Sequence, residues 1–212
     1  MLALSACASG PVFNPILLTP DALTETAPEV YHARFVTSRG VFVIEVQRAW
    51  SPNGADRFYN LVSSGFYDNV RFHRVLRGAL AQFGIHGDSA VAAAWRVRNI
   101  EDDPVMQSNA RGFVSYATSG PNTRSTQVFI NLANNAQLDA LDFAPFGRVV
   151  DGMGVVDGLY SGYGEGAPNG RGPDHTLIEL RGNSYLRRRF PELDFIREAT
   201  IVPLQESDRR NP

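Results

Sequence analysis

Residues 72–88 read FHRVLRGALAQFGIHGD, and residues 120–131 read GPNTRSTQVFIN. In the first stretch, alternation predicts a strand in which Arg74 projects outward, while its neighbour His73 points inward as a core histidine with satisfied hydrogen bonds. In the second stretch, Gly, Pro and Asn form a turn that leads into a β-branched and aromatic run at 127–132. Both stretches therefore predict short strands that carry polar side chains beside an apolar core.

The rest of the chain supplies further short strands and two helices. A proline after Ser51 and apolar residues at helical spacing predict a helix that begins at Ser51 and ends at Gly65. A second short helix is expected at 155–160. Turn residues separate the remaining strand candidates, which are 33–37, 41–46, 80–85, 112–118, 146–150 and 176–181. Many short strands without an internal repeat predict a mainly β fold, a closed antiparallel eight-stranded β-barrel capped by two α-helices.

Composition divides the chain into three parts. Residues 1–30 contain several prolines and no sustained period, so we expect a leader and linker there. Residues 31–182 form the predicted folded domain. Residues 183–212 are expected to be a charged C-terminal extension whose few apolar side chains pack on that domain. The length of 212 residues fits one domain with appendages.

Charge and composition exclude several classes of function. A formal net charge of −2 with mixed signs gives no general attraction to nucleic acid. Every basic residue is arginine, which excludes Schiff-base lysine chemistry and the P-loop lysine. One cysteine and four scattered histidines show no familiar zinc spacing. We therefore expect no nucleic-acid partner and no metal.

Cys7 ends a Leu-Ser-Ala-Cys run that has the form of a bacterial lipobox, in which signal cleavage leaves a lipidated N-terminal cysteine. The six residues before Cys7 are too few for an apolar leader, so this interpretation implies translation from upstream of Met1. The alternative is a chance match to a short pattern. We favour the lipoprotein, and hence the cell envelope over the cytoplasm, because the proline-rich stretch 11–28 would make a suitable tether.

Two other stretches have simpler interpretations. The glycine-rich segment 162–172 lacks the strand-to-helix setting of a dinucleotide site and the terminal Gly-Lys of a P-loop, so it is interpreted as a loop. The acidic run 101–103 precedes Pro104. We interpret it as a turn rather than as a pair of catalytic carboxylates.

The two stretches quoted first resemble the two halves of a cyclophilin active site, and the resemblance covers approximately 31–182. It implies that Arg74 donates a hydrogen bond to the prolyl nitrogen of an Xaa-Pro bond. It also implies that Gln82 binds the substrate backbone or holds the arginine, and that Phe129 is the floor of the proline pocket. Arg74, Gln82 and Phe129 are thus the expected catalytic residues.

The resemblance further implies a groove for an extended peptide. An apolar cup suits a proline ring, which has no N–H donor of its own. In the segment 117–118 the backbone, not the side chains, is expected to pair with substrate. The expected substrate-binding residues are Leu80, Ala117, Thr118, Gln127, Leu138, Phe143 and Phe146.

The sequence departs from the family pattern at Ala79 and Gln137, and also at Phe143, which aligns with a position often held by histidine. Ala79 stands where the family commonly has a phenylalanine, so the cup should be more open and turnover could be reduced. Gln137 stands where some members have the tryptophan associated with tight cyclosporin binding, which puts cyclosporin sensitivity in doubt.

The resemblance implies a cofactor-free peptidyl-prolyl cis/trans isomerase that acts on proline-containing polypeptides during folding, as a monomer with no membrane contact except through Cys7. The alternative is a proline-peptide binding module or chaperone of the same fold with little turnover, which Ala79 motivates. A purely structural envelope protein is a third hypothesis and predicts neither binding nor catalysis.

Overall fold

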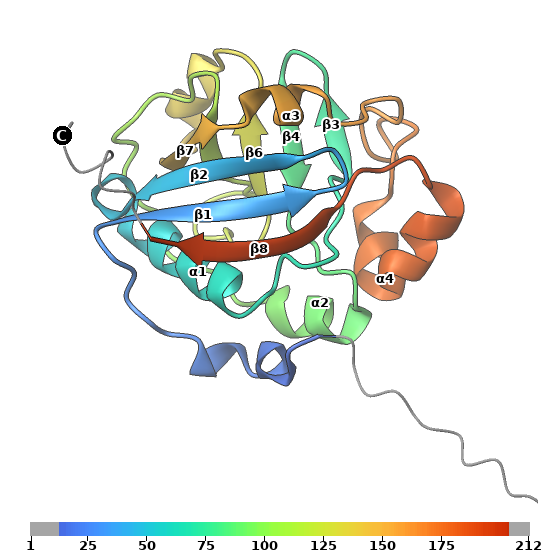
Figure 1. Cartoon of the computed structure of the whole chain (residues 1–212), viewed down its shortest axis with the longest axis horizontal. Coiled ribbons are helices and arrows are strands. Elements are labelled where there is room, and N and C mark those ends of the chain that lie inside the picture. Colours follow the sequence, from blue (N-terminus) through green and yellow to red (C-terminus); the bar gives the residue numbers. More distant parts are fainter. Residues whose placement is uncertain (1–12, 204–212) are drawn as a thin grey trace, which may run out of the picture.

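The structure, a computed structural model, describes residues 13–203, and within them one antiparallel sheet has eight strands in the order β3-β4-β6-β5-β7-β2-β1-β8 (Figure 1). The strands are β1 (Val30–Thr37), β2 (Val41–Gln47), β3 (Arg74–Leu76), β4 (Leu80–Phe83), β5 (Phe113–Tyr116), β6 (Val128–Asn131), β7 (Pro145–Asp151) and β8 (Ile196–Val202). The α-helices are α1 (Pro52–Ser63), α2 (Ser89–Trp95), α3 (Met153–Asp157) and α4 (His175–Arg189). Short 3-10 helices are η1 (Pro15–Leu18), η2 (Pro20–Ala22), η3 (Arg48–Trp50) and η4 (Ala136–Leu141).

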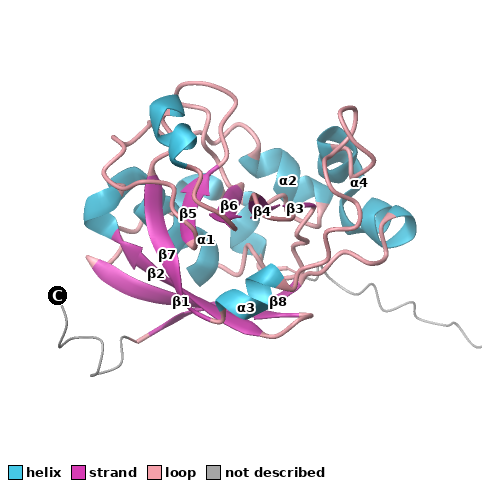
Figure 2. Cartoon of the chain, turned by 90° about the horizontal axis from the view of Figure 1, so that it is seen from above, coloured by secondary structure: helices cyan, strands magenta, loops and turns pink. Residues whose placement is uncertain are grey.

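The sheet is strongly curled, so that β1, β2 and β8 lie on one side of the molecule and the shorter strands β3 to β6 on the other (Figure 2). Its edge strands, β3 and β8, are not joined by a ladder. A bridge between Arg71 and Phe195, together with backbone hydrogen bonds between 69–72 and 194–196, connects the segments that lead into them. The predicted mainly β, eight-stranded antiparallel fold is confirmed. The sheet does not close fully into the predicted barrel. Four α-helices rather than two accompany it within the described residues.

Strand pairing sorts the side chains of the short strands into two rows, because laterally paired residues lie on the same face of a sheet. One row is buried in the core and consists of Val75, Ala81, Ile130 and Val114. The next row, on the opposite face, consists of Arg74, Gln82, Phe129 and Ser115. The period-2 pattern of the sequence therefore places the polar site residues together on the outer face.

Helix α1 closes one end of the core. Its predicted apolar stripe is confirmed, with Ala55, Phe58, Leu61 and Val62 buried. The expected cap is different, because Ser51 makes no side-chain capping bond. Asp103 takes that place, accepting hydrogen bonds from the backbone N–H groups of Asn53 at 3.0 Å and Gly54 at 2.9 Å. A carboxylate from a distant loop thus satisfies the free donors of the first turn.

The C-terminal part corrects two predictions. The expected strand at 176–181 is wrong, because these residues lie in α4, whose Asp174 N-cap accepts from the Leu177 N–H at 2.9 Å. Gly182 interrupts that helix with φ 54°, so the sequence of α4 shows no continuous helical spacing of apolar residues. The expected boundary at residue 182 is also wrong, since β8 pairs along β1 and completes the sheet.

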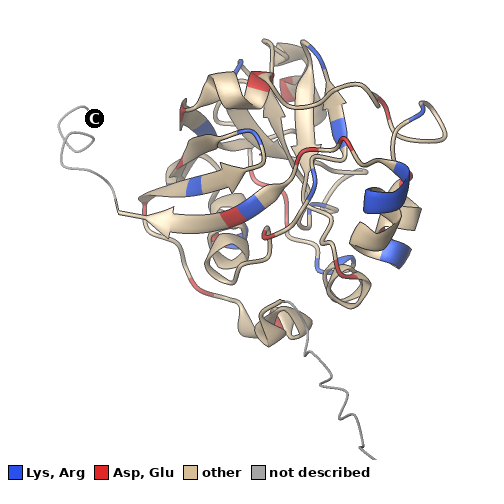
Figure 3. Cartoon of the chain, turned by 45° about the vertical axis from the view of Figure 1, so that its right-hand side comes forward, with Lys and Arg blue, Asp and Glu red and all other residues tan. Residues whose placement is uncertain are grey.

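The described part of the N-terminal segment, 13–29, packs on the domain instead of forming a free linker. Leu17 is fully buried, and its carbonyl accepts a hydrogen bond from the Trp95 indole at 2.9 Å. Cys7 lies outside the described residues. Between residues 13 and 203, no helix is both long enough and apolar enough to span a bilayer. Charges of both signs are interspersed over the ribbon (Figure 3).

Candidate active site

A chain of hydrogen bonds runs across the outer face from β3 to the loop before β6. Arg74 donates through Nη1 to Oε1 of Gln82 at 3.1 Å, and Gln82 donates through Nε2 to Oε1 of Gln127 at 3.0 Å. Arg74 pairs with Gln82 in the sheet, and Gln82 pairs with Phe129. The structure therefore brings together the arginine, both glutamines and the phenylalanine that the sequence singled out.

Arg74 has a second partner that the sequence did not reveal. Its Nε donates to Oε1 of Glu165 at 2.6 Å, and its Nη2 donates to Oε2 at 2.7 Å, a bidentate pair. Glu165 comes from the glycine-rich loop that follows α3. The hydrogen bonds from Arg74 hold the pKa of the Glu165 carboxyl below its usual value. The guanidinium is thus fixed from two sides, by the sheet and by a loop.

Apolar side chains adjoin the arginine. Phe129 is 3% exposed and packs edge-on against Phe143, with ring centroids 5.6 Å apart. Leu80 and Leu138 are half-buried, as a wall that meets substrate would be. The prediction for Phe146 is wrong: its ring is fully buried and packs in the core against Phe58, 4.8 Å between centroids. Phe146 lies in β7 with its ring in the core, whereas Phe143 precedes that strand.

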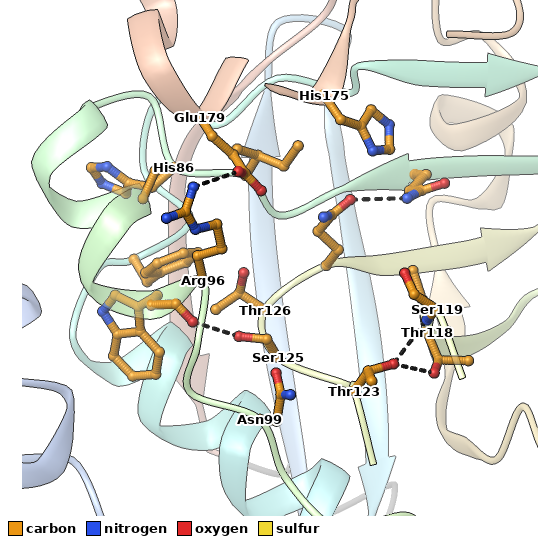
Figure 4. Close-up of a pocket in the computed structure, with 17 residues that line it drawn as sticks. His86, Arg96, Asn99, Thr118, Ser119, Thr123, Ser125, Thr126, His175 and Glu179 are labelled. Carbon is orange, nitrogen blue, oxygen red and sulfur yellow. Dashed lines mark hydrogen bonds and ion pairs between the residues drawn. The ribbon is translucent and has the colours of Figure 1, made fainter. Parts of the chain in front are cut away.

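A cavity of about 390 Å³ lies beside this row (Figure 4). Four expected site residues line this one cavity: Gln82, Gln127, Ala117 and Thr118. Its far wall comes from α2 and α4, whose ends are joined there by the 3.5 Å ion pair of Arg96 with Glu179. The backbone of Ala117 already pairs with Gln127, donating to its carbonyl at 2.9 Å.

Asn109 supports the apolar wall and was missed by sequence reasoning. Its Nδ2 donates to the Asp139 carboxylate and to the Phe143 carbonyl, both at 2.8 Å. The Asn109 N–H also donates to Asp139 at 2.8 Å. Asn109 therefore holds the segment that carries Leu138 and Phe143. No local pattern announces it, because a single asparagine between turns resembles any other loop residue.

His86 and His175 line the cavity, and the ring of His175 meets that of His73 edge-on with centroids 4.8 Å apart. Burial lowers the pKa of the His73 and His175 imidazoles, that of His73 well below the usual value. His73 is a core residue as predicted, but neither ring nitrogen has a hydrogen-bond partner, so the expectation of satisfied bonds is wrong. A neutral His73 adds no charge beside Arg74. Among residues 13–203, no group of three or more His, Cys, Asp or Glu side chains is placed to hold a metal ion.

Comparison with known proteins places this geometry in a family. The sequence profile of the family described as cyclophilin type peptidyl-prolyl cis-trans isomerase/CLD matches residues 32–175, more than half of the chain. The chain belongs to the cyclophilin family. Arg74, Gln82, Gln127 and Phe129 all lie inside the matched region.

Curated cyclophilin relatives agree with this assignment. The peptidyl-prolyl cis-trans isomerase CYP18-1 of Arabidopsis thaliana is 36% identical over 135 residues, which cover 62% of this chain and 80% of that protein. The peptidyl-prolyl cis-trans isomerase-like 1 of Rhizopus delemar is 37% identical over 127 residues, which cover 57% of this chain and 74% of that protein.

Solved cyclophilin structures share the fold. A cyclophilin type peptidyl-prolyl cis-trans isomerase of Cryptosporidium parvum superposes with a TM-score of 0.63 at 21% identity, covering 83% of this chain and 99% of that one. The same protein in the presence of the dipeptide Ala-Pro gives a TM-score of 0.61 at 22% identity, covering 82% of this chain and 99% of that one.

Proposed function

We propose that this cyclophilin accelerates cis/trans isomerisation of Xaa-Pro bonds in flexible polypeptides, with Arg74 as the hydrogen-bond donor in the transition state. The observation that carries the proposal is Arg74 itself, held by Gln82 in one row with the apolar ring of Phe129. A cationic donor beside an apolar cup matches a prolyl bond, which combines a ring without a donor and a nitrogen that becomes basic when the amide twists.

The chemistry needs only a donor and a shaped surface. The barrier of about 18–20 kcal/mol comes from the partial double bond between carbonyl carbon and nitrogen. When the amide twists, its nitrogen becomes pyramidal and accepts a hydrogen bond, so a donor such as Arg74 binds the transition state better than the planar ground state. A charge-assisted bond of about 1.5–3 kcal/mol corresponds to roughly a 10- to 150-fold gain in rate. Positioning of the ring and the preceding carbonyl supplies the remainder.

For the substrate, we propose an extended peptide whose proline ring rests on Phe129, between Phe143 and the half-buried Leu80 and Leu138. The residues before the proline would run toward the cavity lined by Ala117 and Thr118. Support comes from the neighbour of Cryptosporidium parvum, which was solved in the presence of Ala-Pro. The side chain of Gln127 also lines the cavity, where its amide can both donate and accept.

The test is exchange NMR on a short Xaa-Pro peptide with catalytic amounts of the full chain. We expect accelerated exchange, and a fall of tenfold or more in Arg74→Ala, equal to about 1.4 kcal/mol of lost transition-state stabilisation. Arg77→Ala is the matched control, because Arg77 is exposed in the turn just beyond β3 and should leave the rate unchanged. An unaccelerated rate with the unmodified chain would refute the proposal.

The second candidate is a proline-recognition module or chaperone of the same fold, and it is favoured by Ala79. This residue is half-buried at the turn beside Leu80, and its methyl group adds little to the wall of the cup. The exchange experiment separates the two functions, since a module would shift the peptide resonances while exchange stays at its uncatalysed rate.

Attachment to the cell envelope through Cys7 stays a prediction. Mass spectrometry of the protein from its native membrane fraction would show an acylated Cys7 if the lipobox is processed, whereas an unmodified cysteine would contradict it.

A further inference from the structure

The glycine-rich loop 162–172 is built around one carboxylate. The Glu165 carbonyl accepts a hydrogen bond from the Gly172 N–H at 2.7 Å, and the Glu165 side chain accepts another from the Gly166 N–H at 2.9 Å. Gly170 closes the turn by donating to the Gly166 carbonyl at 2.9 Å. These bonds fix both the backbone and the carboxylate of Glu165.

Two glycines are required by this arrangement. A Cβ at Gly170 would lie 2.2 Å from the Glu165 carbonyl oxygen, and one at Gly172 would lie 2.8 Å from it. Contacts under 3.0 Å with backbone force a shift of the chain. Gly170 and Gly172 therefore let the loop close tightly behind Glu165. This close approach is a structural reason for glycine at these two positions.

The contact with Arg74 leaves part of the guanidinium open. Glu165 binds the edge formed by Nε and Nη2, and Gln82 binds one N–H of Nη1. In the part of the chain that the structure describes, no other hydrogen bond of the Arg74 side chain is found. One N–H on each Nη atom therefore faces away from both partners. The side chain of Arg74 is 22% exposed, so these donors have access to a ligand.

We propose that Glu165 is a positioning residue for Arg74, and that the loop 162–172 exists to aim the free end of the guanidinium at the prolyl bond. The inference rests on the proposed isomerase function. A long arginine side chain carries about 2 kcal/mol of rotamer entropy. An arginine already held by two planar partners has lost this freedom before substrate arrives, so less is lost when the transition state forms.

The opposite role, a carboxylate that competes with substrate for Arg74, makes a different prediction. A competitor would occupy the donors that substrate needs, and its removal would raise the rate. The bidentate geometry favours positioning, because the outer edge between Nη1 and Nη2 is left open while Nε is covered.

The experiment compares kcat and KM for the full chain and its variants in exchange NMR on one Xaa-Pro peptide. In Glu165→Ala we expect kcat to fall roughly tenfold with KM nearly unchanged, because positioning acts on the transition state. Glu165→Gln, which can still accept from the guanidinium, should recover part of the loss. Asn169→Ala, at an exposed position of the same loop, is the matched control and should match the unmodified chain.

Two further variants separate positioning from a general structural effect. In an Arg74→Ala background, Glu165→Ala should cause no additional loss, because residues that act through one group are not additive. Gly170→Ala keeps every atom of Glu165 but displaces the loop, so its kcat should also fall. The Arg74 Nε–H resonance in ¹⁵N spectra should be protected from solvent exchange in the unmodified chain and lose that protection in Glu165→Ala.

The outcomes are distinguishable. A raised or unchanged kcat in Glu165→Ala, beside normal catalysis by the unmodified chain, overturns the positioning role alone. An additive loss in the double variant does the same. No acceleration by the unmodified chain refutes the proposed function, and the positioning role falls with it.

Discussion

Replacing Asp103 by alanine should destabilise this protein strongly, although Asp103 lies outside the hydrogen-bonded row of Arg74, Gln82 and Gln127. Its carboxylate accepts hydrogen bonds from the hydroxyl of Ser51 at 2.5 Å and from the first turn of α1. It also accepts from Nη2 of Arg124 at 3.1 Å. The side chains of Asp103 and Arg124 are 3% and 2% exposed. One buried carboxylate thus joins a helix N-terminus to the loop that follows β5.

The magnitude follows from these contacts. Breaking a buried ion pair by removing one partner costs about 3–5 kcal/mol, and loss of an N-cap costs about 0.5–2 kcal/mol. Asp102 still accepts from Nε of Arg124 at 2.9 Å, so the guanidinium keeps one counter-charge and the two costs do not simply add. We therefore expect Asp103→Ala to lower the free energy of unfolding by about 3–5 kcal/mol, out of roughly 5–15 kcal/mol for a whole domain.

Urea denaturation followed by circular dichroism measures this change, and thermal unfolding should show a Tm lower by about 6–20 °C for a chain of this size. Glu101→Ala is the matched control, because Glu101 is exposed two positions away and contributes only its carbonyl to Arg124. It should change stability by less than about 0.5 kcal/mol. A loss below about 1 kcal/mol in Asp103→Ala, or an equal loss in both variants, would refute the buried-network argument.

Three further predictions concern the site and its surroundings. Phe143→Ala removes the half-buried partner of Phe129. The kcat/KM for Xaa-Pro peptides should fall by about three- to tenfold, because an aromatic pair contributes about 0.5–1.5 kcal/mol. An unchanged kcat/KM in exchange NMR would exclude Phe143 from the cup. Ala79→Phe should lower the peptide Kd in NMR titration by narrowing the cup, and a weaker complex would show that the side chain obstructs the groove. Burial lowers the pKa of His73, His86 and His175, so the unfolded chain binds more protons than the folded chain at acidic pH. The free energy of unfolding should therefore fall as pH drops below about 6.5, by up to about 1.4 kcal/mol per pH unit for each histidine. Denaturation at pH 7.5 and 5.5 measures this change, and equal stability at both pH values would contradict the lowered pKa values.

Sequence patterns predicted the local elements well where the period was uninterrupted. The strand that carries Arg74, the strand that follows it in the chain and the apolar stripe of α1 all follow from spacing within a few residues. The same approach predicted the wrong structure at 176–181, because Gly182 interrupts the helix and leaves only a short run before it, too short to show a helical period. Phe146 was assigned to the groove from the family resemblance, whereas the structure buries its ring in the core against Phe58.

Other features depended on partners that no local window contains. Asp103 caps α1 and β8 pairs with β1 although long stretches of chain separate them, and nothing around Ser51 or Ile196 encodes the pairing. The acidic run 101–103, expected to be a plain turn, binds the buried Arg124.

The sequence by itself determined the alternation that puts Arg74, Gln82 and Phe129 on one face, because side-chain direction along a strand is set by neighbouring residues. Only the tertiary structure decided what holds Arg74 there. Glu165 is 91 positions further along the chain, in a loop between α3, which contacts β2, and α4, which packs against α2. Contacts of that range depend on the packing of the whole fold, so they are absent from any pattern of spacing.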